Sequence, residues 1–559
     1  MNNTRNLKVA IVASILQLTG FQSFSQLQSP SWPINVLPIV EKPVFKADTF
    51  NIVKYGAIND GLTLNTKSIN AAIEACSANG GGVVLVPAGL WSTGPVELKS
   101  NVNLHLKSDA VLSFSRDKSQ YKLIEANWEG LAAVRNQPPI SGTGLENVAI
   151  TGKGIVDGNG DSWRMVKREK LTANQWEKLI SSGGALDQSG KIWYPSASSL
   201  KGSQTNNAGA IAPGKTAKDY EDIKDFLRPN LLVLTKTKNI LLEGVTFQNS
   251  PAWNVHPIMC ENIIINNIVV RNPWYGQNGD GLDLESCKNV VVENSVFDVG
   301  DDAICIKSGR DEEGRKRGIP TENVLVKNCT VYHGHGGFVV GSEMSGGAKN
   351  LFITDCTFIG TDIGLRFKTT RGRGGVVEKV YIKNITMKDI PGEAVLFDMY
   401  YGAKSPVFIN DGGAKMPKEA IVPVNEGTPQ FKDIHVNNLV CDGAARGIFV
   451  RGLPEMNIQN IHLENITIQA NNGIQIQDAK RIHFRNVNLI VKNTQPVVDI
   501  MNSSGLTFDG LKYNEGAELI FDVKGERSTN ITLRNAELKS AKSIADFKYG
   551  ATKKALKTQ

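Results

Sequence analysis

The sequence predicts an all-β fold, a single-stranded right-handed parallel β-helix, and two repeating patterns carry that prediction. A nine-residue pattern has a polar first residue, apolar residues at +1, +3 and +8, and Asn, Asp or Gly at +5. A shorter block, small–apolar–x–apolar, recurs between its copies. Short alternating strands cannot each bury an apolar face alone, but stacked strands can. A period of about 25 residues therefore indicates a solenoid with three strands in each coil.

The two patterns alternate over most of the chain. Copies of the nine-residue pattern start at Asn147, Asn239, Asn262, Asn289, Asn323, Asn350, Lys379, Asp433, Asn460, Arg481, Gly505 and Asn530. Copies of the shorter block start at Gly281, Ala303, Gly337, Gly364, Ala394 and Gly447. Because Asn, Asp and Gly tolerate the left-handed backbone, the +5 position is expected at a corner of each coil.

Composition and charge exclude several classes of protein. The 559 residues are 41% hydrophobic and 21% charged, as in folded domains, so a mainly disordered chain is excluded. The net charge of +7 is too small and too dispersed for a nucleic-acid-binding surface. No apolar run is long enough to span a membrane, so we expect no integral membrane segment. A mildly basic surface is compatible with an anionic substrate.

The chain is expected to have four parts. Residues 1–25 have the features of a cleavable signal peptide, with Arg5 and Lys8 before a short apolar core and a small-x-small site ending at Ser25. An N-terminal extension (26–47), a β-helix catalytic domain (48–540) and a basic tail (541–559) follow. The signal peptide predicts a secreted or periplasmic protein, which we expect to be a monomer.

Caps and an insertion complete the predicted domain. The segment 50–61 and a helix over 66–78 are expected to cover the first coil. Residues 161–230 interrupt the repeat as an insertion, which contains a helix capped by Thr172 with Gln175 three residues later. The last 20 residues contain few large apolar side chains, so they are expected to form a frayed tail.

Seven cysteines are too few for a disulfide scaffold. Two pairs share a position in the repeat, Cys329 with Cys356 and Cys260 with Cys287. We interpret them as small residues of interior ladders rather than as disulfides. Their spacing suggests no metal site.

The shorter block places charged residues of four successive coils at one edge. Period-two alternation turns Asp283, Glu285, Cys305, Lys307, Arg366 and Lys368 outward. Asp280 and Asp302 occupy equivalent positions, so they should lie about one strand spacing, roughly 4.8 Å, apart. His335 occupies the position of Asp301 one coil further on. Three carboxylates, a histidine and two cations therefore meet at one place.

This combination suits the hydrolysis of a glycosidic bond. One carboxyl group must protonate the leaving oxygen, and another must activate water or attack the sugar. Crowded carboxylates push their pKa values apart, so that one can stay protonated. Arg366 and Lys368 could pair with a carboxylate on the substrate, which suggests a polymer of uronic acid.

The sequence resembles the polygalacturonase-like pectin hydrolases of glycoside hydrolase family 28, with a pectin-lyase-like β-helix, over roughly residues 50–538. The resemblance rests on four motifs in order: Asn278-Gly279-Asp280, Gly300-Asp301-Asp302, Gly334-His335-Gly336 and Arg366-Phe367-Lys368. It implies an inverting hydrolase of α-1,4-galacturonosyl linkages in pectin, with no metal and no cofactor. Gly279 departs from the family, where Thr is more frequent.

The resemblance also implies roles for single residues. Asp301 would be the general acid, Asp280 and Asp302 would activate the water, and His335 would orient the acid. Arg366 and Lys368 would hold the galacturonate, with Asn278 also counted among the substrate-binding residues. A tyrosine is expected near the cleavage site, and Tyr400 and Tyr401 both qualify. His256 and Trp253 could contact substrate or could equally be buried.

Mode of action and rival functions stay open at this point. The insertion and the segment 310–320 could close one end of the cleft, and the runs 341–347 and 371–375 resemble those of exo-acting bacterial enzymes, so exo action is favoured over endo action. Alternatives on the same fold are a hydrolase of rhamnogalacturonan or xylogalacturonan, and a pectate lyase, which would use Ca²⁺. A non-catalytic polysaccharide-binding β-helix is a further alternative, but it would not be expected to keep all three acids.

Overall fold

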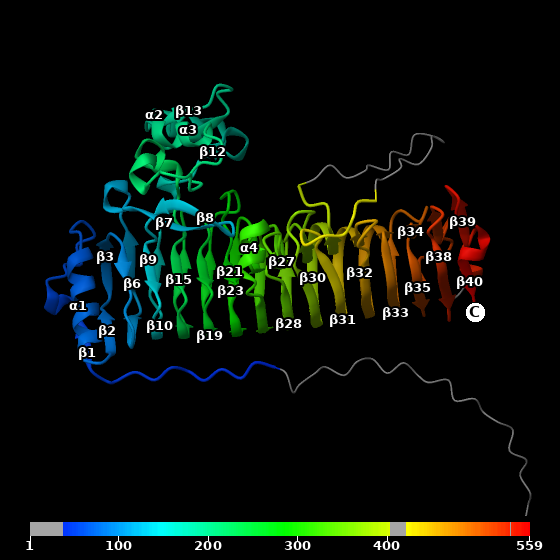
Figure 1. The fold of residues 1–559 in the computed structure, drawn as a ribbon, viewed down its shortest axis with the longest axis horizontal. Helices are drawn as coiled ribbons and strands as arrows, with labels where there is room; N and C mark the ends of the chain where they lie inside the picture. Colours follow the sequence, from blue (N-terminus) through cyan, green and yellow to red (C-terminus); the bar gives the residue numbers. More distant parts are fainter. Residues whose placement is uncertain (1–36, 403–420, 537) are drawn as a thin grey trace, which may run out of the picture. The chain divides into compact units, whose positions relative to one another are not determined.

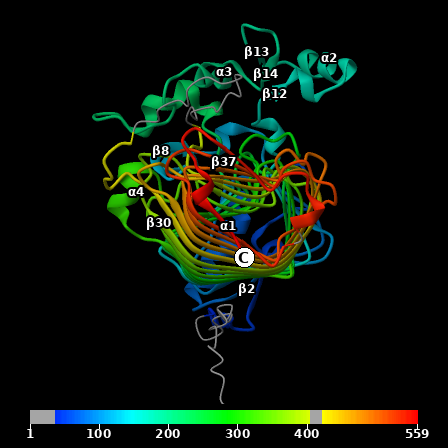
Figure 2. The same ribbon diagram turned by 90° about the vertical axis from the view of Figure 1, so that its right-hand side faces the viewer.

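The computed structural model describes residues 37–402, 421–536 and 538–559, and these form a right-handed parallel β-helix (Figure 1). The predicted fold class is confirmed. Nearly all strands belong to one parallel sheet that winds through three stacks. Figure 2 looks along the solenoid, and the strands of successive coils lie one behind another. Each inner strand bonds to the coils before and after it, which satisfies its backbone groups.

Each stack contains one strand from nearly every coil, and long strands bend through more than one stack. Stack A consists of β4 (Val96–Glu97), β9 (Ile140–Thr143), β15 (Leu232–Thr235), β18 (Val255–Ile258), β21 (Leu282–Glu285), β24 (Asp302–Lys307), β27 (Gly336–Val340), β29 (Leu365–Lys368), the ends of β30 (Val376–Asp398), β31 (Gln430–Arg451) and β32 (Ile458–Gln477), then β34 (Val498–Met501), β37 (Phe521–Lys524) and β39 (Ala545–Lys548). Stack B consists of β1 (Thr49–Asn51), β2 (Gly82–Val86), β5 (Val102–Leu106), β10 (Glu146–Gly152), β16 (Lys238–Glu243), β19 (Glu261–Asn266), β22 (Lys288–Glu293), β25 (Thr321–Lys327), β28 (Ala348–Ile359), parts of β30 to β32, β33 (Ala479–Val491), β35 (Ser504–Asp509), β38 (Thr529–Arg534) and β40 (Leu556–Thr558). Stack C consists of β3 (Gly89–Thr93), β6 (Ala110–Phe114), β11 (Ile155–Asp157), β17 (Thr246–Gln248), β20 (Val269–Arg271), β23 (Val296–Val299), β26 (Thr330–His333), parts of β28 and β30 to β33, and β36 (Lys512–Tyr513).

Asparagines form ladders at the corners of the coils. The +5 residues take the predicted left-handed backbone, with φ of 54° at both Asn267 and Asn294. The first residue of the repeat is left-handed too, which the pattern did not predict. Its amide nitrogen donates to the equivalent oxygen one coil back: Asn262 to Asn239 at 3.0 Å and Asn289 to Asn262 at 3.1 Å. These bonds lock the register between coils.

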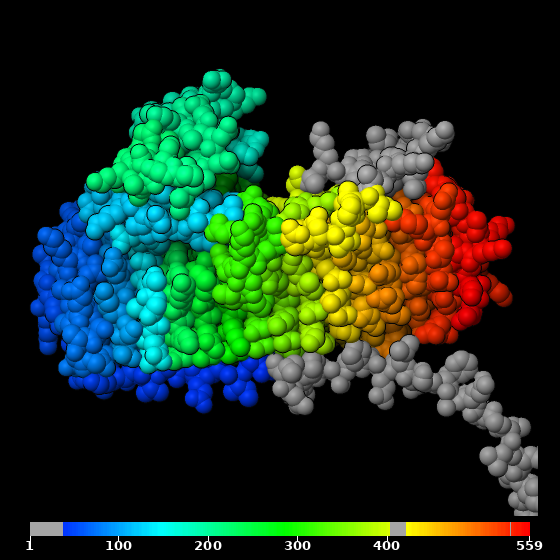
Figure 3. All heavy atoms as spheres, in the orientation of Figure 1, coloured from blue at the N-terminus to red at the C-terminus, as the bar shows by residue number. Residues whose placement is uncertain are grey.

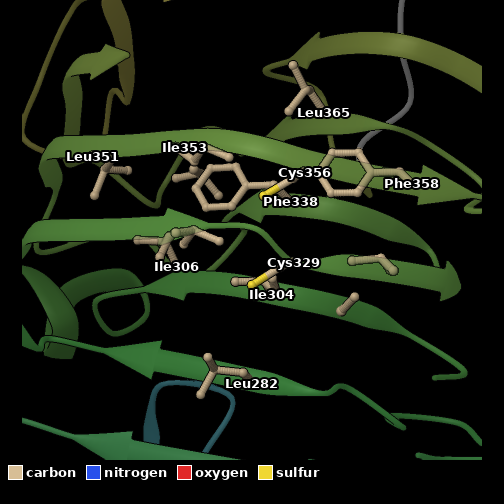
Figure 4. Close-up of a cluster of buried hydrophobic side chains, with 14 of the residues drawn as sticks. Leu282, Ile304, Ile306, Cys329, Phe338, Leu351, Ile353, Cys356, Phe358 and Leu365 are labelled. Atoms are coloured by element: carbon tan, nitrogen blue, oxygen red, sulfur yellow. The ribbon is translucent and has the colours of Figure 1, made fainter. Parts of the chain in front are cut away.

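The interior holds columns of equivalent apolar side chains (Figure 4). Leu282, Ile304, Phe338 and Leu365 follow one another in paired strands and are fully buried. Burial of each such side chain contributes about 1.5–3 kcal/mol. Cysteines also belong to this interior, as Figure 4 shows for Cys329 and Cys356. All seven cysteines are unpaired and buried, which confirms the prediction for Cys260, Cys287, Cys329 and Cys356.

The two ends of the solenoid are closed differently. Helix α1 (Thr66–Ala78) covers the first coil with a buried face that includes Ile69 and Ile73, as predicted. The prediction of a frayed C-terminal tail is wrong: β39 pairs with β37 and β40 pairs with β38. Backbone pairing with the preceding coil orders this segment, so it needs few large apolar side chains. The predicted signal peptide (1–25) and residues 26–36 lie outside the described residues.

The insertion forms a lobe on the solenoid (Figure 3). Its predicted helix is α2 (Ala173–Ser181), with Thr172 and Gln175 in a capping box. Its other elements are α3 (Ala197–Ser203), β12 (Val166–Lys167), β13 (Ala185–Leu186), β14 (Ile192–Tyr194) and 3₁₀ turns at 160–162, 168–170 and 217–226. A second segment leaves the β-helix, and the sequence did not predict it: the antiparallel hairpin of β7 (Leu123–Trp128) and β8 (Leu131–Asn136). Further 3₁₀ turns lie at 52–55, 118–120, 538–540 and 553–555, and α4 spans Asp311–Arg317. Among the described residues, no helix is long and apolar enough to cross a membrane.

Three stacked histidines on the outer face of stack B predict a dependence of stability on pH. The rings of His435, His462 and His483 lie 4.6 and 4.8 Å apart. Burial and the two neighbouring histidines lower the pKa of His462 to about 4. Between that value and the unfolded pKa near 6.5, the unfolded chain binds more protons, so stability falls as pH falls.

We therefore expect His462→Phe, which keeps a stacked ring without a proton site, to reduce the loss of melting temperature between pH 7 and pH 5. The expected difference is about 1–2 °C by calorimetry. An unchanged pH dependence in this variant would contradict the assignment of the effect to the histidine stack.

Candidate active site

Four consecutive strands of stack A position the predicted motif residues. In the register of β21 and β24, Leu282 pairs with Ile304, which places Asp280 beside Asp302. In the register of β24 and β27, Asp302 pairs with Gly336, which places Asp301 beside His335. Val339 pairs with Arg366 in the next step. The positions predicted from the repeat are therefore those in the structure.

Three carboxyl groups meet in a cavity of about 260 Å³. Asp280, Asp301 and Asp302 each present an oxygen within 4.8 Å of the other two. Asp280 and Asp302 are 3% and 1% exposed, whereas 22% of the Asp301 side chain is exposed. Asp301 is thus the member of the trio with the most access to solvent and to a ligand.

Two cations hold Asp302 in its ionised form. Lys368 Nζ lies 2.6 Å from one oxygen of Asp302, and Arg366 donates to the other at 3.1 Å. Burial alone would raise the pKa of Asp302, but the charges of Lys368 and Arg366 outweigh it and hold that pKa well below its usual range. The same pairing raises the pKa values of both cations, although burial opposes it.

His335 is paired with Asp301. Its Nδ1 lies 3.1 Å from the carboxylate, and its backbone N–H donates to the Asp301 carbonyl at 2.9 Å. The hydrogen bond to Asp301 raises the pKa of His335, against the effect of burial. Because the imidazole and the backbone both hold Asp301, its carboxyl group has a fixed orientation beside the cavity.

A buried lysine connects several acids behind the trio. Lys307 Nζ lies 3.1 Å from Glu343, 3.5 Å from Asp283 and 3.9 Å from Asp280. Burial raises the pKa of Asp280 well above its usual value, and the charges of Asp283 and Asp301 add to this. Burial likewise raises the pKa of Asp283, to about 8, against the opposing charge of Lys307. For Glu343, Lys307 and Lys368 outweigh burial and lower the pKa to about 2.

The sequence pattern predicted part of this cluster. Lys307 and Asp283 were expected on the outward face, but nothing indicated their mutual contact. Glu343 lies in the loop after β27, at no repeat position, so no periodicity could place it. The crowding has the expected electrostatic result, since the pKa values of Asp280 and Asp302 lie far apart. Of these two carboxyl groups, Asp280 therefore binds a proton more tightly than Asp302 does.

Comparison with known proteins decides the family. The model of the family "Glycosyl hydrolases family 28" matches residues 171–418. A "Probable polygalacturonase" of Vitis vinifera is 30% identical over 433 residues, which cover 76% of this chain and 74% of that relative. This chain belongs to glycosyl hydrolase family 28. It is therefore a glycoside hydrolase.

Two further proteins resemble this family 28 chain over much of its length. An "Exo-poly-alpha-D-galacturonosidase" of Dickeya chrysanthemi is 29% identical over 360 residues, which cover 63% of this chain and 57% of that relative. The crystal structure of an exopolygalacturonase from Thermotoga maritima has a TM-score of 0.64 and 29% identity, covering 80% of this chain and 93% of that one.

The structure separates the two candidate tyrosines of the family 28 site. Tyr401 lines the three-carboxylate cavity, where Lys368 Nζ lies 4.9 Å from its ring centroid. Tyr400 is 3% exposed, and the guanidinium carbons of Arg371 and Arg451 lie 5.4 and 5.2 Å from its ring centroid. Tyr400 therefore cannot contact a sugar in this structure, and that part of the prediction needs correction.

We expect Tyr401→Ala to raise KM for the substrate about 10-fold or more, because it removes an aromatic wall of the cavity worth about 1–3 kcal/mol. Tyr400→Phe is the matched control, since its hydroxyl has no hydrogen-bond partner among the described residues. Initial-rate kinetics should show no change in KM for Tyr400→Phe. An equal effect of both variants would contradict the assignment of the site to Tyr401.

His256 is a buried support rather than a substrate contact, which corrects its predicted role. It is 1% exposed, its Nε2 lies 3.0 Å from Glu285, and its Nδ1 lies 3.1 Å from the Asn230 amide. Its ring meets the edge of Trp253, which does line the catalytic cavity. The hairpin β7–β8, which the sequence did not predict, contacts two of the neighbours of His256: Trp128 stacks on Trp253, and Asn127 donates to Glu285.

Asn278 lines the cavity, and its side-chain oxygen accepts a hydrogen bond from Arg228 at 2.8 Å. The insertion therefore supports the first motif, since Arg228 belongs to its last residues. The departure at Gly279 has a steric reason: a β-carbon there would lie 2.7 Å from the Gly276 carbonyl oxygen. The backbone turn before Asp280 is compact enough to require glycine.

An ion pair forms part of the cavity wall. Glu129, at the tip of the hairpin β7–β8, lies 3.3 Å from Arg310, and both residues line the cavity. Of the segment 310–320, which was expected to close one end of the cleft, Arg310 lines the cavity, and α4 begins at the next residue. The insertion contributes indirectly, because its 3₁₀ turn (Ala217–Phe226) packs against the same hairpin. Glu129 is far from the motifs in sequence, and no sequence signal placed it here.

Proposed function

We propose that this family 28 enzyme is a polygalacturonase that hydrolyses α-1,4-galacturonosyl linkages of pectin. The observation that carries the proposal is the contact of Lys368 and Arg366 with the three-carboxylate cavity. These two cations offer a galacturonate carboxyl group a charged partner beside the reacting bond. The polygalacturonase names of the relatives support the same substrate.

The proposed reaction assigns a role to each of the three carboxyl groups, to His335, and to the two cations Arg366 and Lys368. Asp301 donates its proton to the glycosidic oxygen, and the bond from that oxygen to the anomeric carbon breaks. Asp280 and Asp302 remove a proton from a water whose oxygen forms the new bond to the anomeric carbon. His335 orients Asp301. A substrate carboxylate that draws Arg366 and Lys368 away from Asp302 makes Asp302 more basic at the moment when a base is needed.

We propose inversion at the anomeric carbon. The short spacing of the carboxyl oxygens is closer to that of retaining enzymes than to the roughly 6.5–9.5 Å typical of inverting ones. Against that, two cations hold Asp302, which weakens it as a nucleophile, and a third carboxylate is present to bind the water. Proton NMR of the first product formed distinguishes the two outcomes. A first product with the α configuration would contradict inversion and assign a nucleophile to Asp280 or Asp302.

We propose exo action, because the ion pair of Glu129 and Arg310 lies in the cavity wall, where it could block one end, and because relatives named as exo-acting share the fold over most of this chain. A time course on polygalacturonic acid, with products separated by anion exchange, tests both substrate and mode. Short products from the start, with slow loss of viscosity, are expected. A ladder of oligomers with rapid loss of viscosity would contradict exo action, and an absence of products would contradict the substrate.

A pectate lyase is the rival function that one observation favours, since three carboxylate oxygens within 4.8 Å of one another could also hold Ca²⁺. The two cations already bound to Asp302 oppose that role. Activity that persists in excess chelator, without a new ultraviolet-absorbing double bond, is the expected result. Loss of activity in chelator with such absorbance would favour the lyase.

We propose that the protein is exported to the periplasm or secreted and acts as a monomer. Residues 1–25, which carry the signal-peptide features, support this, and they lie outside the described residues. Mass spectrometry of protein from a host that exports it should give a mature chain that begins after Ser25. A full-length chain retained in the cytoplasm would contradict the export signal.

A further inference from the structure

A second cavity, of about 860 Å³, lies beneath the hairpin β7–β8. Its floor is the outer face of stack A before the motif coils, including Val233, Thr235 and Ile258. Its lining shares no residue with the catalytic cavity. Residues of the two linings contact one another: the ring of Trp128 in this lining stacks on that of Trp253 in the other, and Arg228 donates a hydrogen bond to Asn278. The second cavity is within the size range of ligand sites in proteins.

A buried guanidinium group that forms no ion pair with the described residues lines this cavity. Arg135 is 5% exposed, and its guanidinium carbon lies 3.5 Å from the ring centroid of Trp128. Its side-chain nitrogens make no hydrogen bond and no ion pair within the described part of the chain. A buried charge is costly unless it is paired and hydrogen-bonded. Arg135 is therefore poised to pair with an anion from outside the chain.

Two buried amides in the same lining also have unused hydrogen-bonding capacity. Asn136 and Asn230 are 0% and 5% exposed. Their nitrogens donate to Leu227 and His256, whereas neither side-chain oxygen has a hydrogen-bond partner among the described residues. Amide oxygens accept hydrogen bonds from hydroxyl groups. The lining thus combines a site for an anion with acceptors for neutral donors.

The wider lining favours a negative ligand. Five cationic and three acidic side chains line the cavity, but Arg317 is ion-paired with Glu285 and Arg228 donates to Asn278. The positive excess left for a ligand is therefore small and comes from Lys99, Lys122 and Arg135. Two of the acids are already engaged: Glu313 accepts from the Ala132 backbone, and Glu97 accepts from Gln137. Lys122 is exposed at the edge and adds to the positive charge near Arg135.

We propose that this second cavity is a binding site for a small carboxylate-bearing saccharide, with Arg135 as the carboxylate partner. The planar guanidinium group can hold a carboxylate through two parallel hydrogen bonds. The amide oxygens of Asn136 and Asn230 accept from sugar hydroxyl groups. The choice of galacturonate as the specific ligand rests on the proposed function, since that reaction produces it beside this cavity.

Isothermal titration of the whole mature protein with galacturonic acid tests this site, because the monomer cannot be hydrolysed. Two sites are expected in the unaltered enzyme. Arg135→Gln should weaken one of them at least 10-fold, and the edge variant Lys122→Glu should weaken the same site about 3-fold. Arg366→Ala should weaken only the other. Lys153→Glu makes the same charge change at an exposed position outside both cavities and should bind as the unaltered enzyme does.

Several results would overturn the inference. One is a single site that is lost in Arg366→Ala and unaffected by Arg135→Gln and Lys122→Glu. Another is binding of inorganic phosphate, or of galactose without its carboxylate, at the Arg135 site as tightly as galacturonate. If a lower melting temperature shows that Arg135→Gln disturbs the fold, the affinity of Lys122→Glu for galacturonic acid becomes the test of the site. Galacturonate binding that depends on Arg135, in a protein that does not cleave polygalacturonate, would refute the proposed function and leave this site standing.

Discussion

Replacing Asp301 with asparagine is expected to lower kcat on polygalacturonate about 10²–10⁴-fold, with KM and the fold little changed. Asparagine keeps the shape of the side chain and can still bond to His335, but it cannot donate a proton to the leaving oxygen. Asp301 is the most exposed of the three carboxyl groups and lies 3.1 Å from the imidazole that orients it. The measurement is the initial rate of formation of reducing ends, with circular dichroism to check the fold.

A second substrate distinguishes the residue that acts as the acid from the residue that acts as the base. An aryl galacturonide has a leaving group that needs little protonation, so Asp301→Asn should retain much more of its activity on it than on the polymer. Asp280→Asn, which removes a proposed base, should lose activity on both substrates. The comparison matters because burial raises the pKa of Asp280, which on electrostatics alone makes Asp280 the protonated carboxyl.

The reversed pattern would contradict the assignment. If the aryl substrate rescued Asp280→Asn and not Asp301→Asn, the two roles would be exchanged, and the pKa order of the free protein would also be that of the working enzyme. Turnover of the polymer by Asp301→Asn at close to the unaltered rate would exclude Asp301 as the acid altogether.

The repeat predicted the motif residues well because strand register in a parallel β-helix is a property of the sequence pattern. One buried column, such as Leu282, Ile304 and Phe338, sets which residues of the following coils lie beside one another. A slip of one residue would turn that column outward. The relative positions of Asp280, Asp302 and His335 follow from the same register.

Residues outside the repeat could not be placed in this way. Glu129 and Glu343 lie on a hairpin and a loop whose paths depend on packing, so period-two alternation says nothing about them. The same limit explains His256, which faces outward in the repeat but is buried beside residues that the hairpin β7–β8 contacts. It also explains Tyr400 and Tyr401, since the alternation ends at the strand before them.

Replacing Lys307 with methionine is expected to have the largest effect on stability, about 3–5 kcal/mol, because it leaves buried acids without their cation. Lys307 is 3% exposed and lies within 3.9 Å of Asp280, Asp283 and Glu343. The loss should show as a lower midpoint in urea at pH 7.5. Lys327→Met is the matched control: its ion pair with Glu293 is 2.8 Å long but exposed, so at most about 1 kcal/mol should be lost.

The pH dependence distinguishes this charge effect from a loss of packing. Asp280 and Asp283 have pKa values raised by burial, so the folded state binds their protons more tightly than the unfolded state does. Stability from these groups therefore falls as pH rises from the unfolded value near 4 toward the folded pKa, about 8 for Asp283. Asp280 and Asp283 already hold most of their protons at pH 7.5, so the pH dependence of the loss comes from Glu343, whose pKa Lys307 lowers to about 2. Without Lys307 that pKa rises, so the destabilisation by Lys307→Met should be larger at pH 7.5 than at pH 5. A difference independent of pH would mean that Lys307 stabilises the site through its contact with Trp253, 4.4 Å from its ammonium group, rather than through the acids.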